Sequence, residues 1–316
     1  MNEPRISLIV CTRNRASGLP RFFASVASLS APVGGWELVI VDNGSTDDTK
    51  AIIDEFGRTV AMPVLYVHES SPGLARARNA GLAAARGAIL AFTDDDCYPR
   101  PDFLIAMVGV FDTHQPGFVG GRVLLHDPAD ARIAIKDLEE SVVIRPRSYI
   151  RPGLIHGANM AITREVLRRI GGFDPHLGAG TACFAGEDTE YLARASWDGS
   201  PGRYDPGPVV SHHHGRKPGP DAQRHVSGYD YGRGAYFAAS LLHPAARRTY
   251  FGYWWRHVAK SVRKGRLSKL WREAVGASRY YRARLLQPAE RRNAHRTTTA
   301  TTRIDQEQHA SRISNT

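Results

Sequence analysis

The chain has 316 residues, 42% of them hydrophobic, which is enough for one large globular domain or two small ones. No stretch reaches the ~18 uninterrupted apolar residues of a membrane span, and the amino terminus shows no signal-peptide pattern. Three widely spaced cysteines, Cys11, Cys97 and Cys183, favour reduced thiols in a cytosolic protein over a disulfide framework.

The formal charge of +11 is concentrated in one segment. Residues 247–284 hold 12 Lys and Arg against a single acid, Glu273, while the rest of the chain holds 30 residues of each sign. A pI of 9.8 is typical of nucleic-acid-binding proteins, but the balanced remainder argues against a nucleic-acid partner. Because Trp254, Trp255 and Trp271 lie in the basic segment, we expect a peripheral contact with anionic lipid.

The spacing of apolar residues in the basic segment leaves that expectation open. Its apolar residues Trp255, Val258, Val262 and Leu267 do not form a regular stripe, so the predicted helix is only loosely amphipathic. The alternative is a solvated pair of helices packed on the rest of the protein.

The first 126 residues alternate between strand and helix patterns. Apolar, β-branched runs predict buried strands at 6–11, 37–41, 64–67 and 88–93. Helical spacing predicts helices at 19–29, 45–56 and 73–86, and Ser45 with Asp48 resembles a capping box. This rhythm predicts an α/β fold with a mostly parallel sheet and helices on both faces.

The rhythm changes after Pro101. We expect strands at 118–125 and 154–162 and helices at 131–143, 165–170 and 187–195, after a helix that runs through Val110. Val209 and Val210 lead into three consecutive histidines, and the last ~30 residues are polar and predicted to be disordered.

Three consecutive aspartates, Asp94, Asp95 and Asp96, follow the buried strand at 88–93. Carboxylates repel one another, so such a cluster needs a positive partner. A divalent cation carrying a diphosphate is a natural one, because Mg²⁺ prefers one or two carboxylates plus phosphate oxygens and water. The alternative is an acidic turn that caps the next helix.

Five sequence segments occur in the order typical of one enzyme family. They are 7–15 (SLIVCTRNR), 39–45 (VIVDNGS), 73–81 (GLARARNAG), 92–96 (FTDDD) and 186–188 (GED). With these five segments taken together, the chain resembles the family-2 glycosyltransferases of GT-A fold over residues 6–214. The resemblance implies transfer of a sugar from a nucleotide-activated donor to an acceptor hydroxyl, with inversion at the anomeric carbon.

The resemblance implies a division of the chain. Residues 1–220 would form the GT-A domain, with a nucleotide-binding half at about 1–126 and an acceptor-binding half at about 127–220. A basic helical extension at 221–286 and the polar tail at 287–316 would follow.

On the donor side, the resemblance implies that the nucleotide sugar contacts the strand ends. Asp42 would accept a hydrogen bond from the base, although it could instead begin an Asx turn. Thr12 and Arg15 would contact base and ribose, and Arg78 would offset diphosphate charge unless it is a solvated helix arginine. Asp94 and Asp95 complete the donor-binding set.

The resemblance also implies a metal site and an acceptor side. Asp94 and Asp96, with His212 as the favoured histidine of the triplet, would hold Mg²⁺ or Mn²⁺. Asp188 would be the general base, with Glu187 and Asn159 on the acceptor side. Acidic residues at a helix start can also serve only to complement the helix dipole.

Other enzyme classes fit less well. A sugar-nucleotide-forming nucleotidyltransferase usually has a glycine-rich loop after the first strand, and here no glycine precedes Gly18. A hydrolase with paired carboxylates would not explain Asp42. The chain lacks the Gln-x-x-Arg-Trp pattern of processive synthases, so we expect one sugar per encounter. A glycan or lipid-linked acceptor, in envelope assembly at the inner face of the cell membrane, is the predicted setting.

Overall fold

The computed structural model describes residues 3–286. Residues 1–280 form one compact unit, and only the end of the last helix, 281–286, is described of the other unit, 281–316. The predicted polar tail therefore lies outside the described residues. None of the described helices is long and apolar enough to cross a membrane.

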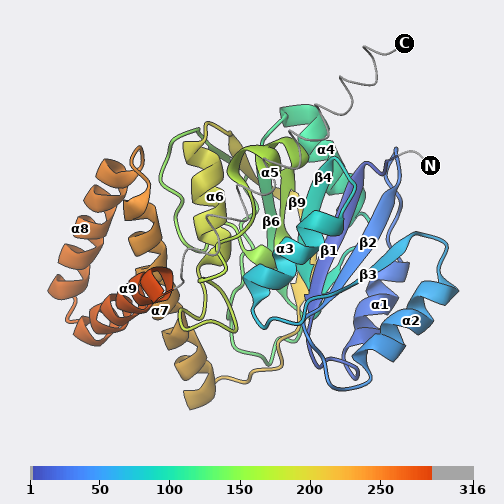
Figure 1. Cartoon of the computed structure of the whole chain (residues 1–316), viewed down its shortest axis with the longest axis horizontal. Coiled ribbons are helices and arrows are strands. Elements are labelled where there is room, and N and C mark those ends of the chain that lie inside the picture. Colours follow the sequence, from blue (N-terminus) through green and yellow to red (C-terminus); the bar gives the residue numbers. More distant parts are fainter. Residues whose placement is uncertain (1–2, 287–316) are drawn as a thin grey trace, which may run out of the picture. The chain divides into compact units, whose positions relative to one another are not determined.

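A single mixed sheet forms the centre of the compact unit (Figure 1). The strand order is β3-β2-β1-β4-β8-β6-β9-β5, with β7 paired to β9. The first four strands are parallel, as expected, whereas β8 runs antiparallel to both β4 and β6. The strands are β1 (Ile6–Thr12), β2 (Trp36–Asp42), β3 (Val64–His68), β4 (Ile89–Asp94), β5 (Cys97–Pro99), β6 (Phe118–Leu125), β7 (Val142–Ile144), β8 (Met160–Thr163) and β9 (Gly202–His212).

Helices cover both faces of the sheet because the central strands are apolar on both faces (Figure 1). Leu8 and Val10 pack with α1, α2 and α4, while Ile9 packs on the opposite side with α3, α5 and α6. These helices are α1 (Leu19–Ala27), α2 (Thr49–Thr59), α3 (Leu74–Ala84), α4 (Phe103–His114), α5 (Arg164–Ile170) and α6 (Glu187–Trp197). The two apolar layers fix the sheet and hence the positions of its strand ends.

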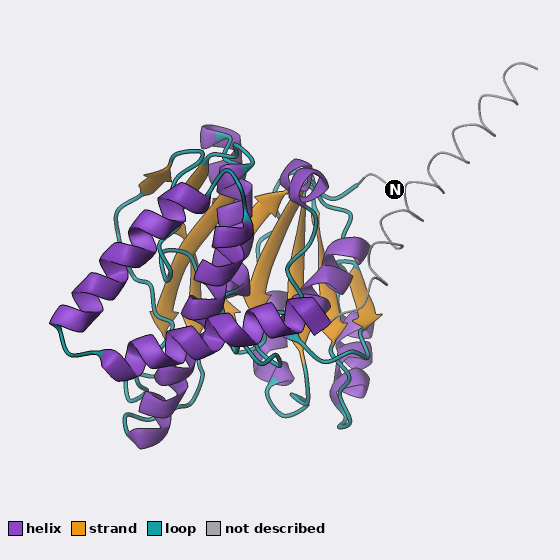
Figure 2. Cartoon of the chain, turned by 60° about the vertical axis from the view of Figure 1, so that its left-hand side comes forward, coloured by secondary structure: helices purple, strands orange, loops and turns teal. Residues whose placement is uncertain are grey.

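Three further helices form the predicted C-terminal extension: α7 (Pro220–Leu242), α8 (Arg247–Arg263) and α9 (Leu267–Leu286) (Figure 2). Helices α7 and α9 cross closely at two glycines. A Cβ on Gly234 would lie 1.8 Å from the carbonyl oxygen of Glu273, and one on Gly276 would lie 2.0 Å from that of Tyr231. The extension thus packs tightly through small residues.

Two segments differ from the sequence-based expectation. The helix predicted at 131–143 is absent: Lys136 forms backbone hydrogen bonds with Val123 of β6, and the segment continues into β7. Ile133 is buried in this extended chain, so its core contact outweighs helical propensity. The strand predicted at 154–162 begins only at Met160, after a 3₁₀ turn (η1, Gly157–Asn159) in which Gly157 N–H is bonded to a side chain.

The predicted capping box at Ser45 and Asp48 is also wrong. Ser45 Oγ accepts a hydrogen bond from the backbone of Asn14, which draws it away from the helix. Helix α2 begins after Asp48, whose side chain makes no capping bond, while Asp47 accepts from Thr49 N–H. A loop-to-loop bond therefore replaces the local cap.

The buried carboxylate of Glu37 lies near the amino-terminal ends of β1 and β2, opposite the strand ends that carry the aspartates. Glu37, fully buried in β2, accepts hydrogen bonds from Ser7 Oγ at 2.7 Å, from Arg86 N at 2.6 Å and from Arg86 Nε at 2.8 Å. Ser7 Oγ in turn accepts from Gly87 N–H at 2.8 Å. This network ties the turn between α3 and β4 to β1 and β2.

We predict that Glu37→Gln lowers the free energy of unfolding at pH 7 by about 1.5–3 kcal/mol, because charge-assisted bonds to the carboxylate are lost. Burial raises the pKa of Glu37, but the bonds from Ser7 and Arg86 outweigh it and hold the pKa below the ordinary 4.5. The stabilisation is therefore complete above pH 4.5 and is lost as the pH falls through the folded-state value. Urea denaturation of both proteins from pH 7 to pH 3 should show the difference shrinking; a constant difference would contradict the assignment.

Candidate active site

Three parallel strands end at one edge of the sheet and carry polar side chains there. Thr12 of β1 is in register with Asp42 of β2, and Cys11 is in register with Asp94 of β4. Ligands of open α/β sheets bind beyond the carboxyl ends of the strands. The structure thus brings Thr12, Asp42 and Asp94 to a common edge.

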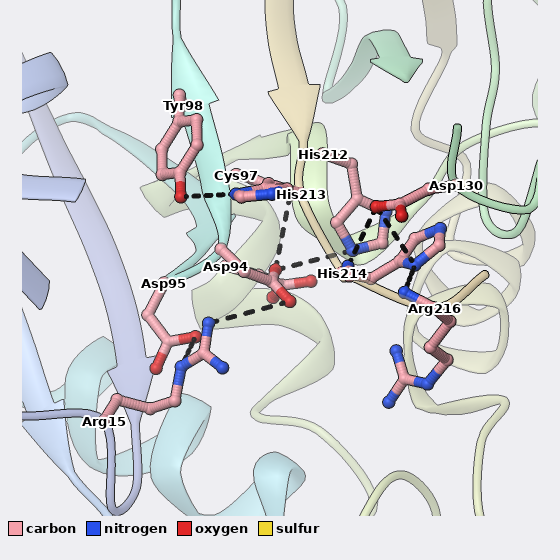
Figure 3. A network of polar contacts seen from close by, with 12 residues as sticks. Arg15, Asp94, Asp95, Cys97, Tyr98, Asp130, His212, His213, His214 and Arg216 are labelled. Atoms are coloured by element: carbon pink, nitrogen blue, oxygen red, sulfur yellow. Dashed lines mark hydrogen bonds and ion pairs between the residues drawn. The ribbon is translucent and has the colours of Figure 1, made fainter. Parts of the chain in front are cut away.

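Asp95 lies between the β1 loop and the other aspartates. Thr12 Oγ1 donates to Asp95 Oδ2 at 2.6 Å. Figure 3 shows Arg15 beside Asp95, with Arg15 Nε 3.4 Å from Asp95 Oδ1. Burial nevertheless raises the pKa of Asp95 to about 6, and it also raises the pKa of Asp94 against the opposing charge of Arg78. Burial thus disfavours the charged forms of Asp94 and Asp95, and a bound cation would favour them.

Asp96 faces His212, the last residue of β9. His212 Nε2 lies 3.4 Å from Asp96 Oδ1, because β5 pairs with β9 directly after the aspartates. Burial alone would raise the pKa of Asp96, but the imidazole of His212 and the charge of Arg15 hold it below its usual range. Burial would lower the pKa of His212, and Asp96 raises it instead.

The donor set at this position fits a divalent ion. Ligand atoms of Asp96, Cys97 and His212 all lie within 4.8 Å of one another. Carboxylate oxygen and imidazole nitrogen are ordinary ligands of Mn²⁺-like ions. Burial holds the pKa of the Cys97 thiol well above its usual value. His212 Nδ1 is buried without a hydrogen-bond partner among residues 3–286.

The three consecutive histidines face different surroundings (Figure 3). The rings of His212 and His214 lie 5.0 Å apart, and His214 Nε2 is 2.9 Å from the carbonyl oxygen of Ala131. His213 points elsewhere, with its Nδ1 3.2 Å from the hydroxyl of Tyr98. Among the three, His212 is thus the histidine that faces Asp96.

A second group of possible ligands in the described part of the chain, Asp127, Asp130 and His213, already has a cation. Lys217 Nζ lies 2.6 Å from Asp127 and 2.8 Å from Asp130. These ion pairs satisfy the two carboxylates without a metal ion.

A buried arginine connects the aspartates to α6. The Arg78 guanidinium, 3% exposed, lies 3.4 Å from Asp94 Oδ1 and donates to Glu187 Oε1 at 2.9 Å. Its planar group lies over the rings of Phe92 and Phe173, 5.9 and 5.5 Å from their centroids. Arg78 is therefore not the solvated helix arginine that the sequence left open, and both its visible partners are carboxylates.

The acidic pair at the start of α6 has two different environments. Asp188 Oδ2 accepts from Gly157 N–H at 2.9 Å, and Oδ1 accepts from Thr189 N–H at 2.6 Å. Burial and the neighbouring Asp188 raise the pKa of Glu187, against the opposing charge of Arg78. Gly157 must be glycine here, because a Cβ would lie 2.4 Å from Arg78 Nη2. The 3₁₀ turn thus holds Asp188 and covers Arg78 at the same time.

Asp42 makes structural hydrogen bonds through both oxygens. Oδ1 accepts from Ser45 N–H at 2.8 Å, and Oδ2 accepts from the hydroxyl of Tyr66 at 3.0 Å. The turn expected as the alternative is therefore present, and a base contact by Asp42 would be made in addition to it. That contact remains a prediction.

Asn159, predicted on the acceptor side, is fully buried. Its amide nitrogen donates to the carbonyl oxygens of Arg122 and Pro208 at 2.8 and 3.0 Å. These bonds join the 3₁₀ turn to β6 and β9. A direct acceptor contact by Asn159 remains a prediction, whereas its role in positioning the turn is visible.

Sequence reasoning missed three residues around the site. Tyr229 of α7 and the half-buried His156 interact electrostatically with Asp188, and Arg216 interacts with Asp96. Burial raises the pKa of Tyr229 to about 12 and lowers that of His156. None of them belongs to a recognisable motif; only the position of Arg216, two residues after the last histidine of the triplet, could have suggested it.

A family model described as "Glycosyl transferase family 2" matches residues 7–171, which is just over half of the chain. The chain belongs to glycosyl transferase family 2. The matched region contains all three strand ends and the aspartates, while Asp188 and His212 lie beyond it.

Similar proteins with assigned names are also glycosyltransferases. Glycosyltransferase AglE of Haloferax volcanii is 28% identical over 193 residues, 61% of this chain and 62% of that protein. The pre-mycofactocin glycosyltransferase of Mycobacterium tuberculosis is 29% identical over 218 residues, 66% of this chain and 43% of that protein. The chain thus matches about two fifths to three fifths of the length of these relatives.

Solved structures support the fold. The mannosyltransferase PcManGT of Pyrobaculum calidifontis, solved with GDP-Man and Mn²⁺, has a TM-score of 0.61 and 22% identity, covering 95% of this chain and 80% of that chain. Staphylococcus aureus TarS residues 1–349 with UDP has a TM-score of 0.59 and 17% identity, covering 78% and 68%. The family-2 chain therefore has a GT-A fold followed by a helical extension.

We predict that Asp96→Asn weakens Mn²⁺ binding in the presence of GDP or UDP. Loss of an outer partner of a metal ligand typically costs about 10–100-fold in affinity, and loss of a ligand itself should cost at least as much. Titration of free Mn²⁺ by electron paramagnetic resonance measures this. The matched control is Asp102→Asn, an exposed carboxylate paired with Arg100, which should bind as wild type does. Equal Mn²⁺ affinity of Asp96→Asn and wild type would refute the metal assignment.

Proposed function

We propose that this protein transfers a sugar from a nucleoside diphosphate donor to an acceptor hydroxyl in one inverting, metal-dependent step. The observation that carries the proposal is the chain of charges Asp94–Arg78–Glu187, in which Arg78 and Glu187 are buried and Asp94 is partly exposed. It connects the strand-end carboxylates suited to a donor with the carboxylate pair of α6 suited to an acceptor. Both halves of a transfer site thus share one edge of the sheet.

The donor would lie over the ends of β1, β2 and β4, with Thr12, Arg15, Asp42 and Asp95 around the nucleotide. Asp96 and His212, with Asp94 beside them, are the residues that would hold Mg²⁺ or Mn²⁺. A metal ion bound there would neutralise charge on the departing diphosphate. PcManGT, with GDP-Man and Mn²⁺, and TarS, with UDP-GlcNAc, support a nucleotide-sugar donor.

The acceptor side supplies a base. As the acceptor oxygen forms a bond to the anomeric carbon, the carbon–oxygen bond to the diphosphate breaks on the opposite face, and its electron pair leaves with the nucleoside diphosphate. The hydroxyl proton passes to Asp188. Attack opposite the leaving group inverts the anomeric centre, so the enzyme needs no covalent intermediate.

Surrounding residues fix the position of this base. Gly157 N–H and Thr189 N–H each bond one oxygen of Asp188, so the carboxylate has a defined orientation. Oδ1 also accepts from Thr189 Oγ1 at 3.1 Å, so Oδ2, which accepts only from Gly157 N–H among the described residues, is the oxygen that would take the proton. We assign Glu187 a positioning role, because Arg78 already occupies one of its oxygens.

For the setting, we propose a glycan or lipid-linked acceptor in envelope polysaccharide or glycolipid assembly, with one sugar added per encounter. A relative named PGL/p-HBAD biosynthesis glycosyltransferase supports a role in a biosynthetic sugar transfer. The three free cysteines support a cytoplasmic location, at the inner face of the membrane. A nucleotidyltransferase or a nucleic-acid-binding protein is disfavoured, since neither is a member of this family.

We predict that Asp188→Asn lowers turnover by roughly 10²–10⁴-fold, because an amide cannot accept the acceptor proton. Donor affinity should change little, since the amide has nearly the same shape. The measurement is nucleoside diphosphate release from a panel of GDP- and UDP-sugars with Mn²⁺, with water as the acceptor where none is added.

The matched control is Glu165→Gln, an exposed carboxylate in the first turn of α5 that pairs with Arg169. It should keep wild-type turnover. A near wild-type rate for Asp188→Asn would refute its role as base.

A further inference from the structure

Helix α8 has an apolar stripe on its outer face. Phe251, Trp255 and Val262 are each more than half exposed. Their spacings of four and eleven residues are close to one and three turns of about 3.6 residues, so the three side chains lie on one side of the helix. The sequence suggested no regular stripe because it did not show that α8 ends at Arg263, before Leu267.

The inner face of α8 is already in use. Tyr250 is fully buried, and its hydroxyl lies 2.9 Å from that of Tyr236, which is 2.7 Å from the carbonyl oxygen of Ile150. Further along, His257 Nε2 lies 2.9 Å from Glu273 Oε2 of α9. Because these contacts anchor the helix, the stripe cannot turn inward and stays exposed on the described surface.

The charge around the stripe has one sign. Helix α8 contains no acidic residue, and it is exposed at Arg248, Arg256, Lys260 and Arg263. The single acid of residues 247–284, Glu273, is buried and paired with Arg233 and His257. The basic charge at the surface is therefore not neutralised within this segment.

We propose that α8 docks on the surface of an anionic lipid bilayer. Aromatic side chains favour the headgroup level of a membrane, and Lys and Arg beside them attract anionic headgroups. Helix α9 begins with the same combination, because Leu267 and Trp271, one turn apart, are 62% and 71% exposed. This docking goes beyond the transfer reaction and needs neither donor nor acceptor.

Vesicle sedimentation of the full chain, without nucleotide sugar, tests the proposal. The protein should sediment with phosphatidylcholine vesicles that contain 30% phosphatidylglycerol, and not with pure phosphatidylcholine, and binding should fall as NaCl increases. Serine at Phe251, Trp255 and Val262 together should abolish most of this binding. Gln at Arg256, Lys260 and Arg263 should weaken it on the order of a hundredfold.

Matched controls carry the same chemical changes elsewhere on the exposed surface. Serine at Val33, Ile105 and Val143 controls for lost apolar surface, and Gln at Arg58, Arg145 and Arg168 controls for lost charge. Both control proteins should bind anionic vesicles as wild type does. Thermal unfolding confirms that each variant is folded.

Several results would overturn the proposal. One is no sedimentation of wild type with anionic vesicles; another is equal binding by the stripe variant. A wild-type dimer that becomes a monomer in the stripe variant, without vesicle binding, would assign the face to a second copy of the chain. Binding of single-stranded RNA in place of vesicles would assign it to nucleic acid. If a variant fails to fold, quenching of wild-type tryptophan fluorescence by brominated lipid decides the question: Trp255→Phe should reduce the quenching, and no quenching of wild type would overturn the proposal.

Discussion

One buried guanidinium holds the two halves of this site together. Arg78 lies between Asp94 at the end of β4 and Glu187 at the start of α6, stacked against two aromatic rings. An uncompensated buried charge costs several kcal/mol, and the charge of Arg78 lowers the pKa of both carboxylates against the opposing effect of burial. The glycine at 157 follows from the same constraint, because any side chain there would displace the guanidinium.

Much of the fold could be predicted from local pattern. Strand β6 has the predicted bounds. Strand β1 is one residue longer at its end, and β2 and β4 differ from their predicted bounds by one residue at each end, because continuous β-branched runs have few other stable arrangements. The segment at 131–143 could not be predicted, since its extended form depends on pairing between Lys136 and Val123. Prediction of 154–162 failed for a similar reason: the Gly157 N–H bonds a carboxylate 31 residues away.

The site was predictable to the extent that its residues end strands or begin helices. Register alone brings Asp42 and Asp94 to one edge, and strand pairing brings His212 to Asp96. The role of Arg78 was not predictable, because its partner Glu187 lies 109 residues away and only the folded chain joins them. His156 and Tyr229 were missed for the same reason, since each reaches the site from an element without a motif.

The account depends on the strand-end carboxylates forming a donor site that needs a divalent ion. Calorimetric titration of the wild-type protein with GDP and with UDP, each with Mn²⁺ and with EDTA, tests this without knowledge of the acceptor. We expect one of the two nucleotides to bind with Mn²⁺ and to lose most of its affinity in EDTA, because the aspartates would then repel the diphosphate. Binding of equal affinity in EDTA, or no binding of either nucleotide with Mn²⁺, would contradict the account.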